Sequence, residues 1–178
     1  GSISGGEIYN VGIINSYFNA NRNVGGIAGR TNFNSVIENC YSEATISSTY
    51  GCGGISASGA SNSGKPAVTI KNCYFNGVLI PRGSTYMSGI YGSTYVQIID
   101  SYYNSSKCSK GNSKYAKSDE QFKSGLVAYL LNGDQSAIVY GQTIGTEDYP
   151  VFGGETVYGG YADCDSENLS VTNDANMV

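Results

Sequence analysis

Carboxylate, thiol and phenol side chains are the groups with which this chain could do chemistry, because its 178 residues include no histidine. Histidine is the commonest general base and a common metal ligand, so its absence removes the usual catalytic triads. Glycoside hydrolysis needs a pair of carboxylates on one face. The central part of the sequence supplies Glu38, Glu43 and Asp100, which are scattered. We therefore expect no catalytic residues and no enzyme.

The thiols do not form a recognisable metal or disulfide pattern. An odd number of cysteines and the lack of a CxxC pair argue against a disulfide framework and against zinc. Cys40 and Cys73 occupy the same place in a repeated phrase, and we expect both to be buried and reduced. The other cysteines are Cys52, Cys108 and Cys164.

The acids near the end of the chain also lack the spacing of a calcium-binding loop. They are Glu147, Asp148, Asp163, Asp165 and Glu167. The sequence therefore predicts no bound metal and no cofactor. The chain has a net charge of −4 and no basic cluster, so nucleic acid is not an expected partner. No apolar run is long enough to cross a bilayer, and we expect no membrane insertion.

A repeated phrase organises the first 108 residues. "VIENCYSEATI" from Val36 and "VTIKNCYFNGVLI" from Val68 are nearly the same, and "VGIINSYFN" from Val11 and "VQIIDSYYN" from Val96 are fainter copies. Aligned on Asn15, Asn39, Asn72 and Asp100, each copy has Ile two residues before this position and Tyr two residues after it. A second motif places Ile27, Ile55 and Ile90 in register.

Such short β-rich phrases, punctuated by glycine, predict an all-β fold in which equivalent side chains stack at about 4.8 Å. The expected architecture is a parallel β-solenoid, or β-helix, of about four coils, and right-handed crossovers are favoured. Side-chain parity changes between Ile37 and Cys40, so Asn39 and Asn72 are expected at a bend. Cys40, Ser42, Ala44 and Ile46 then point inward.

The same parity directs one tyrosine of each copy outward. We expect Tyr17, Tyr41, Tyr74 and Tyr102 to form a ladder along an outer face. Such a ladder stabilises neighbouring coils by ring stacking, and it also offers a surface to a ligand. Stacking without a ligand is the simpler interpretation. Glu38 above Lys71 is expected to be an exposed ion pair between coils.

Together, "VGGIAGR", "VIENCYSEATI", "YGCGGISAS" and "VTIKNCYFNGVLI" resemble the GLUG-motif repeats of bacterial surface proteins, including IgA-peptidase-type and adhesin-like proteins. The resemblance covers roughly residues 8 to 108. It implies an architecture rather than an activity. The first and last copies depart from the pattern, with Ser16 and Ser101 in place of cysteine.

Residues 109–178 have a different composition. A polar, lysine-containing linker precedes "SDEQFKSGLVAYLLNG", which predicts one helix with Ser118 as N-cap and Gln121 completing a capping box. Its expected apolar face holds Phe122, Leu126, Tyr129 and Leu130, and Gly133 ends it. A short β tail follows, and we expect helix and tail to cap the solenoid.

The leading functional hypothesis is a non-catalytic structural or adhesive module, exposed on the surface of a bacterial secreted or cell-wall protein. It would be extracellular, and a monomer or part of a longer chain. The first alternative is a module that binds a host glycan or surface protein through the tyrosine ladder. The second is a β-helical enzyme that degrades polysaccharides, which needs clustered carboxylates.

Overall fold

The computed structural model describes residues 1–60, 68–83, 86–133, 135–159 and 169–177, and the chain forms two compact units. The first unit is Gly1–Ala116 and the second is Lys117–Val178. The first unit thus extends past residue 108, where the sequence places the end of the repeats. Cys164, Asp163, Asp165 and Glu167 lie outside the described residues.

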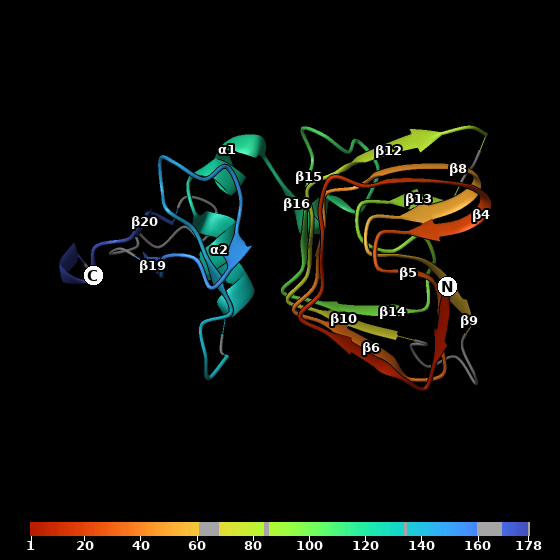
Figure 1. Cartoon of the computed structure of the whole chain (residues 1–178), viewed down its shortest axis with the longest axis horizontal. Helices are drawn as coiled ribbons and strands as arrows, with labels where there is room; N and C mark the ends of the chain where they lie inside the picture. Colours follow the sequence, from red (N-terminus) through yellow and green to blue (C-terminus); the bar gives the residue numbers. More distant parts are fainter. Residues whose placement is uncertain (61–67, 84–85, 134, 160–168, 178) are drawn as a thin grey trace. The chain divides into compact units, whose positions relative to one another are not determined.

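Four parallel sheets make up the first unit, and each is named here by its first strand. The β1 sheet contains β1 (Ser2–Ser4), β5 (Ala28–Asn32) and β9 (Ser56–Ala60). The β2 sheet contains β2 (Glu7–Tyr9), β6 (Ser35–Glu38), β10 (Val68–Lys71) and β14 (Val96–Ile99). The strands β6, β10 and β14 lie next to one another in Figure 1.

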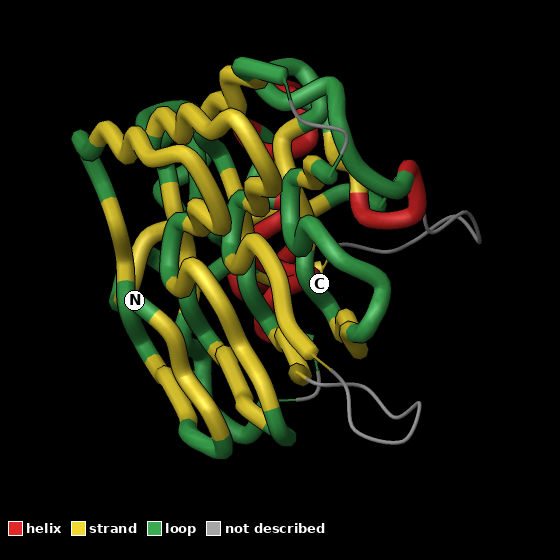
Figure 2. The backbone as a smooth tube through the Cα atoms, turned by 90° about the vertical axis from the view of Figure 1, so that its right-hand side faces the viewer, coloured by secondary structure: helices red, strands yellow, loops and turns green. Residues whose placement is uncertain are grey.

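The other two sheets complete each turn of the chain. The β3 sheet contains β3 (Gly12–Ile13), β7 (Tyr41–Ser42), β11 (Tyr74–Phe75), β15 (Tyr102–Asn104) and β16 (Ala116–Lys117). In the β4 sheet, β8 (Thr45–Gly53) pairs with β4 (Tyr17–Gly25), β12 (Val78–Pro81) and β13 (Met87–Ser88). Successive turns lie side by side in Figure 2. The fold is therefore all-β, and its parallel sheets are consistent with the expected β-helix.

The asparagine bend predicted from parity is present. Asn39 and Asn72 have φ of 52° and 50°, and Asp100 has φ of 40°. Asn donates its backbone N–H to the next turn at this bend, from Asn39 to Lys71 O at 3.1 Å and from Asn72 to Ile99 O at 3.1 Å. Asn tolerates this left-handed backbone because its short polar side chain bonds locally. The bend therefore stacks from turn to turn.

The alignment of the first copy on Asn15 is wrong. Ile8 pairs with Ile37, and Asn10, with φ of 56°, donates its N–H to Glu38 O at 3.3 Å. Asn10 is therefore the residue in register with Asn39. Asn15 also has a positive φ, of 49°, so both residues satisfy the local signal for a bend. Pairing between turns, which is a tertiary interaction, selects Asn10.

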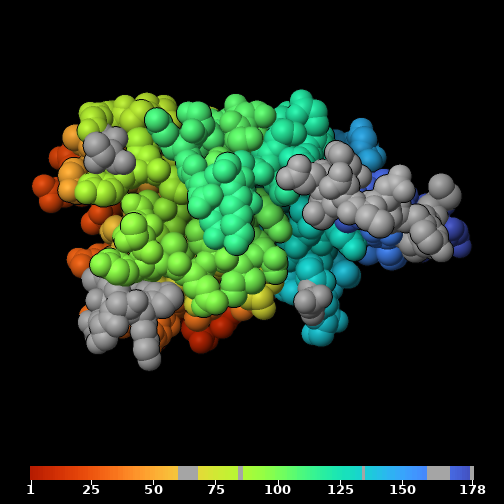
Figure 3. Space-filling model, turned by 180° about the vertical axis from the view of Figure 1, so that it is seen from behind, coloured from red at the N-terminus to blue at the C-terminus, as the bar shows by residue number. Residues whose placement is uncertain are grey.

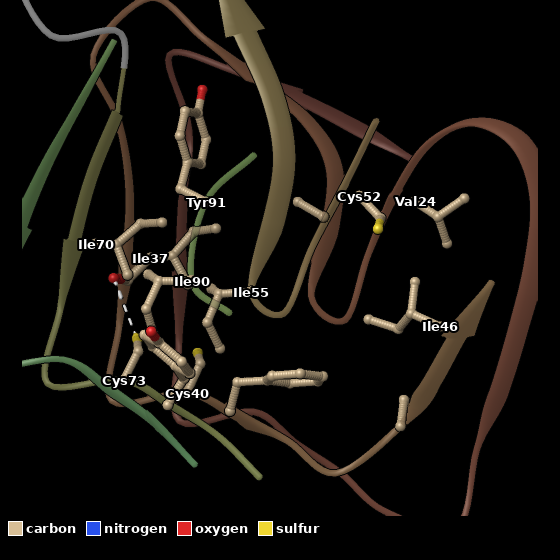
Figure 4. Close-up of a cluster of buried hydrophobic side chains, with 14 of the residues drawn as sticks. Val24, Ile37, Cys40, Ile46, Cys52, Ile55, Ile70, Cys73, Ile90 and Tyr91 are labelled. Atoms are coloured by element: carbon tan, nitrogen blue, oxygen red, sulfur yellow. Dashed lines mark hydrogen bonds between the residues drawn. The ribbon is translucent and has the colours of Figure 1, made fainter. Parts of the chain in front are cut away.

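The core between the sheets holds the repeat residues in the predicted orientation. Cys40, Ser42, Ala44 and Ile46 are all fully buried, and so is Ile37 before the bend. Figure 4 shows Ile37, Ile70, Cys40 and Cys73 together, with Ile55 and Ile90 beside them. Ile27 N donates to Ile55 O at 2.9 Å and Ile55 N to Ile90 O at 3.0 Å, which confirms the register of the second motif.

Glycines of the second motif face aromatic side chains of the β3 sheet on the opposite wall. Ser42, Phe75 and Tyr103 are in register in the β3 sheet. A Cβ added to Gly54 would lie 2.2 Å from Phe75 Cγ, and one added to Gly89 would lie 2.3 Å from Tyr103 Cγ. Only glycine leaves room for these rings, so the motif's glycines set the distance between two walls of the core.

The segment after the last repeat packs against the turns of the first unit and is not only a solvated linker. Cys108 is buried, and Gly89 N donates to Lys110 O at 2.7 Å. Tyr115 and Ala116 pack against the hydrophobic core, and β16 pairs with β15. Seen from behind, the surface of the first unit is largely yellow-green and green, so the residues of the later turns and those of this segment share this face (Figure 3). This segment therefore covers part of the last turn.

The second unit contains two short helices where the sequence predicts one. α1 spans Asp119–Lys123 and α2 spans Leu126–Asn132, separated at Gly125 with φ of 87°. The capping box of Ser118 and Gln121 is confirmed, and Gly133 follows the last helical residue. The predicted apolar face is wrong in part, because the chain forms two helices and α2 buries a face of its own. Tyr129 is exposed and Leu130 is half-buried, whereas Val127, Ala128 and Leu131 are buried with Phe122 and Leu126.

The rest of this unit consists of two short antiparallel pairs and a turn. β17 (Tyr140–Gly141) pairs with β18 (Val151–Phe152), and β19 (Tyr158–Gly159) pairs with β20 (Val171–Thr172). Short 3₁₀ turns occur at Ala175–Met177 here and at Ser113–Tyr115 in the first unit. The expected β tail is thus present. Its role as a cap of the solenoid stays a prediction.

Candidate binding surfaces

The predicted tyrosine ladder exists over three turns. Tyr74 pairs with Tyr41 on one side and with Tyr102 on the other. The rings of Tyr41 and Tyr74 are stacked, with centroids 4.9 Å apart and planes 1° apart. This separation is close to the spacing of neighbouring strands, so in-register pairing alone brings the rings together. The ladder stabilises adjacent turns whether or not it binds a ligand.

Tyr17 does not belong to this ladder. It pairs with Thr45 in the β4 sheet, and its side chain is 61% exposed. The first-turn partner of Tyr41 is Gly12, where an added Cβ would lie 2.4 Å from Tyr41 Cζ. The Tyr41 ring therefore lies over a residue without a side chain. This correction follows from the register shift between Asn15 and Asn10.

Exposure differs strongly along the ladder. Tyr41 and Tyr102 are half-buried, whereas Tyr74 is fully buried. Burial, together with the nearby carboxylate of Asp100, raises the pKa of Tyr102 to about 12. The outer face thus does not present the continuous exposed strip of four rings that the sequence predicts. Ligand binding by Tyr41 and Tyr102 stays a prediction.

Of the carboxylates considered for catalysis, Glu38 forms an ion pair, and Glu43 and Asp100 lie in different turns. Glu38 Oε1 lies 3.2 Å from Lys71 Nζ, which confirms the ion pair between turns. Asp100 is at the bend of the fourth turn, and Glu43 follows β7 in the second. Glu147 accepts a hydrogen bond from Thr143 N. Among the residues that the structure describes, no group of three or more Cys, Asp or Glu side chains is arranged to hold a metal ion.

Cys40 and Cys73 are free thiols, fully buried and adjacent in the stack. Cys73 Sγ donates to Lys71 O at 3.1 Å and to Ile37 O at 3.5 Å, and the second of these contacts is drawn in Figure 4. Burial raises the pKa of the Cys73 thiol well above its usual value. A buried thiol of this kind packs as a small apolar group rather than reacting. The prediction of buried, reduced thiols at these two positions is confirmed.

Sequence reasoning missed a group of exposed residues at a corner of the β4 sheet. Arg22 pairs with Tyr50, and the Arg22 Cζ atom lies 5.0 Å from the centroid of the Tyr50 ring. The Tyr86 ring is 5.8 Å from that of Tyr50, at 60°. Arg82 Nη2 donates to Ala20 O at 3.1 Å. We call Arg22, Tyr50, Arg82 and Tyr86 the corner patch.

A sequence signal for part of this patch exists. Arg22 stands two residues before the "VGGI" motif and Tyr50 two residues before "CGGI". In both cases the intervening residue has a positive φ, of 52° at Asn23 and 77° at Gly51. The two residues are therefore equivalent in the repeat, and aligning the second motif as carefully as the first would have placed them together.

Comparison with known families identifies the repeat. The sequence model of the GLUG motif matches residues 20–47. Ala20 pairs with Ser48 in the neighbouring strand, so the matched segment is one turn of the fold. The chain therefore contains a GLUG motif, as the resemblance implied, over a shorter stretch than residues 8 to 108. No curated protein and no solved structure matches the chain. In the described parts of the chain, every helix is too short to cross a membrane.

Proposed function

We propose that this chain is a non-catalytic structural or adhesive module of a bacterial secreted or cell-wall protein, exposed outside the cell. Its scaffold would be a right-handed β-solenoid. The observation that carries the proposal is how the repeat residues are used: the side chains at equivalent positions pack against one another between turns. Packing between turns is sufficient to account for the repetition of the phrase, and no catalytic role of these residues is needed to explain it.

Several features of the first unit support this proposal. The GLUG motif coincides with one turn, and Ile37, Ile70, Cys40 and Cys73 have no exposed surface. The rings of Tyr41 and Tyr74 stack between turns, and Tyr102 is in register with Tyr74 in the next turn. Each added turn extends such a scaffold by about 4.8 Å, which suits a protein that carries other parts away from a surface. The alternative of a glycan- or protein-binding module is favoured by the exposed rings outside the ladder, such as Tyr50 and Tyr86.

Two measurements test the proposal. An antibody against the module should label intact cells that express the full-length protein, without permeabilisation. Incubation with a panel of plant and host glycans should release no new reducing ends. Release of reducing ends would overturn the non-catalytic assignment, and labelling only after permeabilisation would overturn the extracellular one.

A further inference from the structure

The corner patch is held in place by the backbone of three successive turns. Arg22 belongs to β4, Tyr50 to β8, and Arg82 and Tyr86 follow β12. Buried Ser48 fixes the bend: its Oγ accepts from Tyr50 N at 3.2 Å and donates to Gly51 O at 3.2 Å. The bend directs Tyr50 outward, where its side chain is 49% exposed. The hydrogen bonds of Ser48 therefore hold the bend that places Tyr50 on the outer surface.

The arginines of the patch keep hydrogen-bonding capacity for a ligand. The Arg22 guanidinium lies over the Tyr50 ring, and a guanidinium carries five N–H donors in its own plane. Arg82 uses Nη2 for Ala20 O. Lys71 and Lys123 form ion pairs with carboxylates, whereas within the described parts of the chain no carboxylate lies within 4 Å of Arg22 or Arg82. Both arginines thus present positive charge to solvent.

Charge is distributed unevenly between the two units. Residues 1–116 contain eight Lys and Arg against four Asp and Glu, whereas residues 117–178 contain two against ten. The whole chain has a net charge of −4, but its first unit has a net charge of +4. The corner patch therefore lies on a positively charged unit, which attracts an anionic ligand.

The geometry also decides between two classes of anionic polymer. Single-stranded nucleic acid binds by stacking bases on free aromatic faces. One face of Tyr50 carries the Arg22 guanidinium, and the planes of the Tyr50 and Tyr86 rings are 60° apart, so the two rings do not offer parallel faces to successive bases. The patch thus presents the planar N–H donors of its arginines beside the exposed ring of Tyr86. The N–H donors match the carboxylate or sulfate groups of an acidic sugar, and the ring matches the C–H face of that sugar.

We propose that Arg22, Tyr50, Arg82 and Tyr86 form a binding site for an acidic polysaccharide, with the two guanidinium groups contacting its carboxylate or sulfate groups. This inference rests on the proposed adhesive function and names its ligand class. The site is distinct from the tyrosine ladder, whose central ring is buried.

Calorimetric titration of the whole chain tests this site with four probes: hyaluronan, which carries only carboxylates; heparin, which is sulfated; neutral dextran; and an oligo-dT strand. We expect hyaluronan, heparin or both to bind, and dextran not to bind. Binding of hyaluronan would show that carboxylates suffice, and binding of heparin alone would show that sulfate groups are needed. No binding to either acidic polymer at low salt would overturn the inference. Tighter binding of oligo-dT that is lost in Arg22→Ala would also overturn it.

Variants separate this site from general electrostatic attraction. Arg22→Ala should weaken binding at least about tenfold, because it removes a charge-assisted hydrogen bond. Tyr50→Phe should bind nearly as well as the wild type, and Tyr50→Ala should bind weakly, because the ring positions Arg22. The matched controls are Arg30→Ala and Tyr95→Ala, which change exposed residues outside the patch. Equal losses in Arg22→Ala and Arg30→Ala would show general attraction and refute the site.

The outcome is also distinguishable from a failure of the proposed function. Urea midpoints of all variants should match the wild type, so that lost binding is not lost folding. Absence of binding without new reducing ends would refute only this site. New reducing ends from hyaluronan or heparin would refute the non-catalytic function itself.

Discussion

Replacing Gly54 by alanine should test the contact between the glycine motif and the aromatic side chains of Phe75 and Tyr103. An alanine Cβ at this position would lie 1.9 Å from Gly89 O and 2.2 Å from Phe75 Cγ. Ordinary contact begins at 3.4 Å, so the neighbouring turn would have to move by about 1.5 Å. The first of these neighbours is backbone, which a change of side-chain rotamer cannot relieve.

The expected cost follows from this displacement. Overpacking a tight core costs about 1–3 kcal/mol, and a clash with backbone belongs at the upper end. We expect Gly54→Ala to lower the free energy of unfolding by about 2–3 kcal/mol, which lowers the melting temperature by about 8–12 °C for a unit of this size. Adding Phe75→Ala to the Gly54→Ala variant should restore little of the lost free energy of unfolding, because the contact of the new Cβ with Gly89 O persists.

Thermal and urea unfolding, followed by far-ultraviolet circular dichroism, measure this effect. Gly6→Ala is the matched control, since its added Cβ would meet only the Ile3 side chain, at 3.1 Å. We expect that control to change the melting temperature by less than about 3 °C. Equal melting temperatures for Gly54→Ala and Gly6→Ala would refute the claim that glycine sets the distance between the walls.

Three further outcomes are expected. Cys40 and Cys73 should react with a thiol reagent only after denaturant is added, and rapid labelling of the folded chain would contradict their packing. Stability should be full below about pH 9 and should fall from there toward pH 11, because burial raises the pKa of Cys52 from its ordinary value of 9.0 to about 11 and the unfolded chain loses this proton first. Urea midpoints at pH 8, 9 and 10 measure the fall, and a flat profile would contradict it. Ser118→Ala should destabilise the second unit by about 1 kcal/mol through loss of the N-cap, whereas Ser118→Asp should not, and equal urea midpoints for the two variants would count against the capping role.

The sequence alone predicted the repeated turns and their orientation. Ile, Cys and Asn recur at fixed offsets, and residues at equal offsets in stacked parallel strands occupy the same environment. Cys40 and Cys73 are therefore predicted to be buried together. Parity around the bend at Asn39 predicts that Cys40 points inward and Tyr41 outward. The capping box at Ser118 was predictable for a similar reason, because it depends only on residues three apart in the chain.

Tertiary structure decided whatever depended on contacts between distant residues. Asn10 and Asn15 both adopt the left-handed backbone of a bend, and only pairing of Ile8 with Ile37 selects the first. Propensity did not reveal the break at Gly125, because the helix-forming residues on both sides outweigh a single glycine. The contact of Arg22 with Tyr50 joins residues from different turns, so it arises when stacking brings them to 5.0 Å. Local sequence specifies each turn, whereas register between turns specifies the surface they present together.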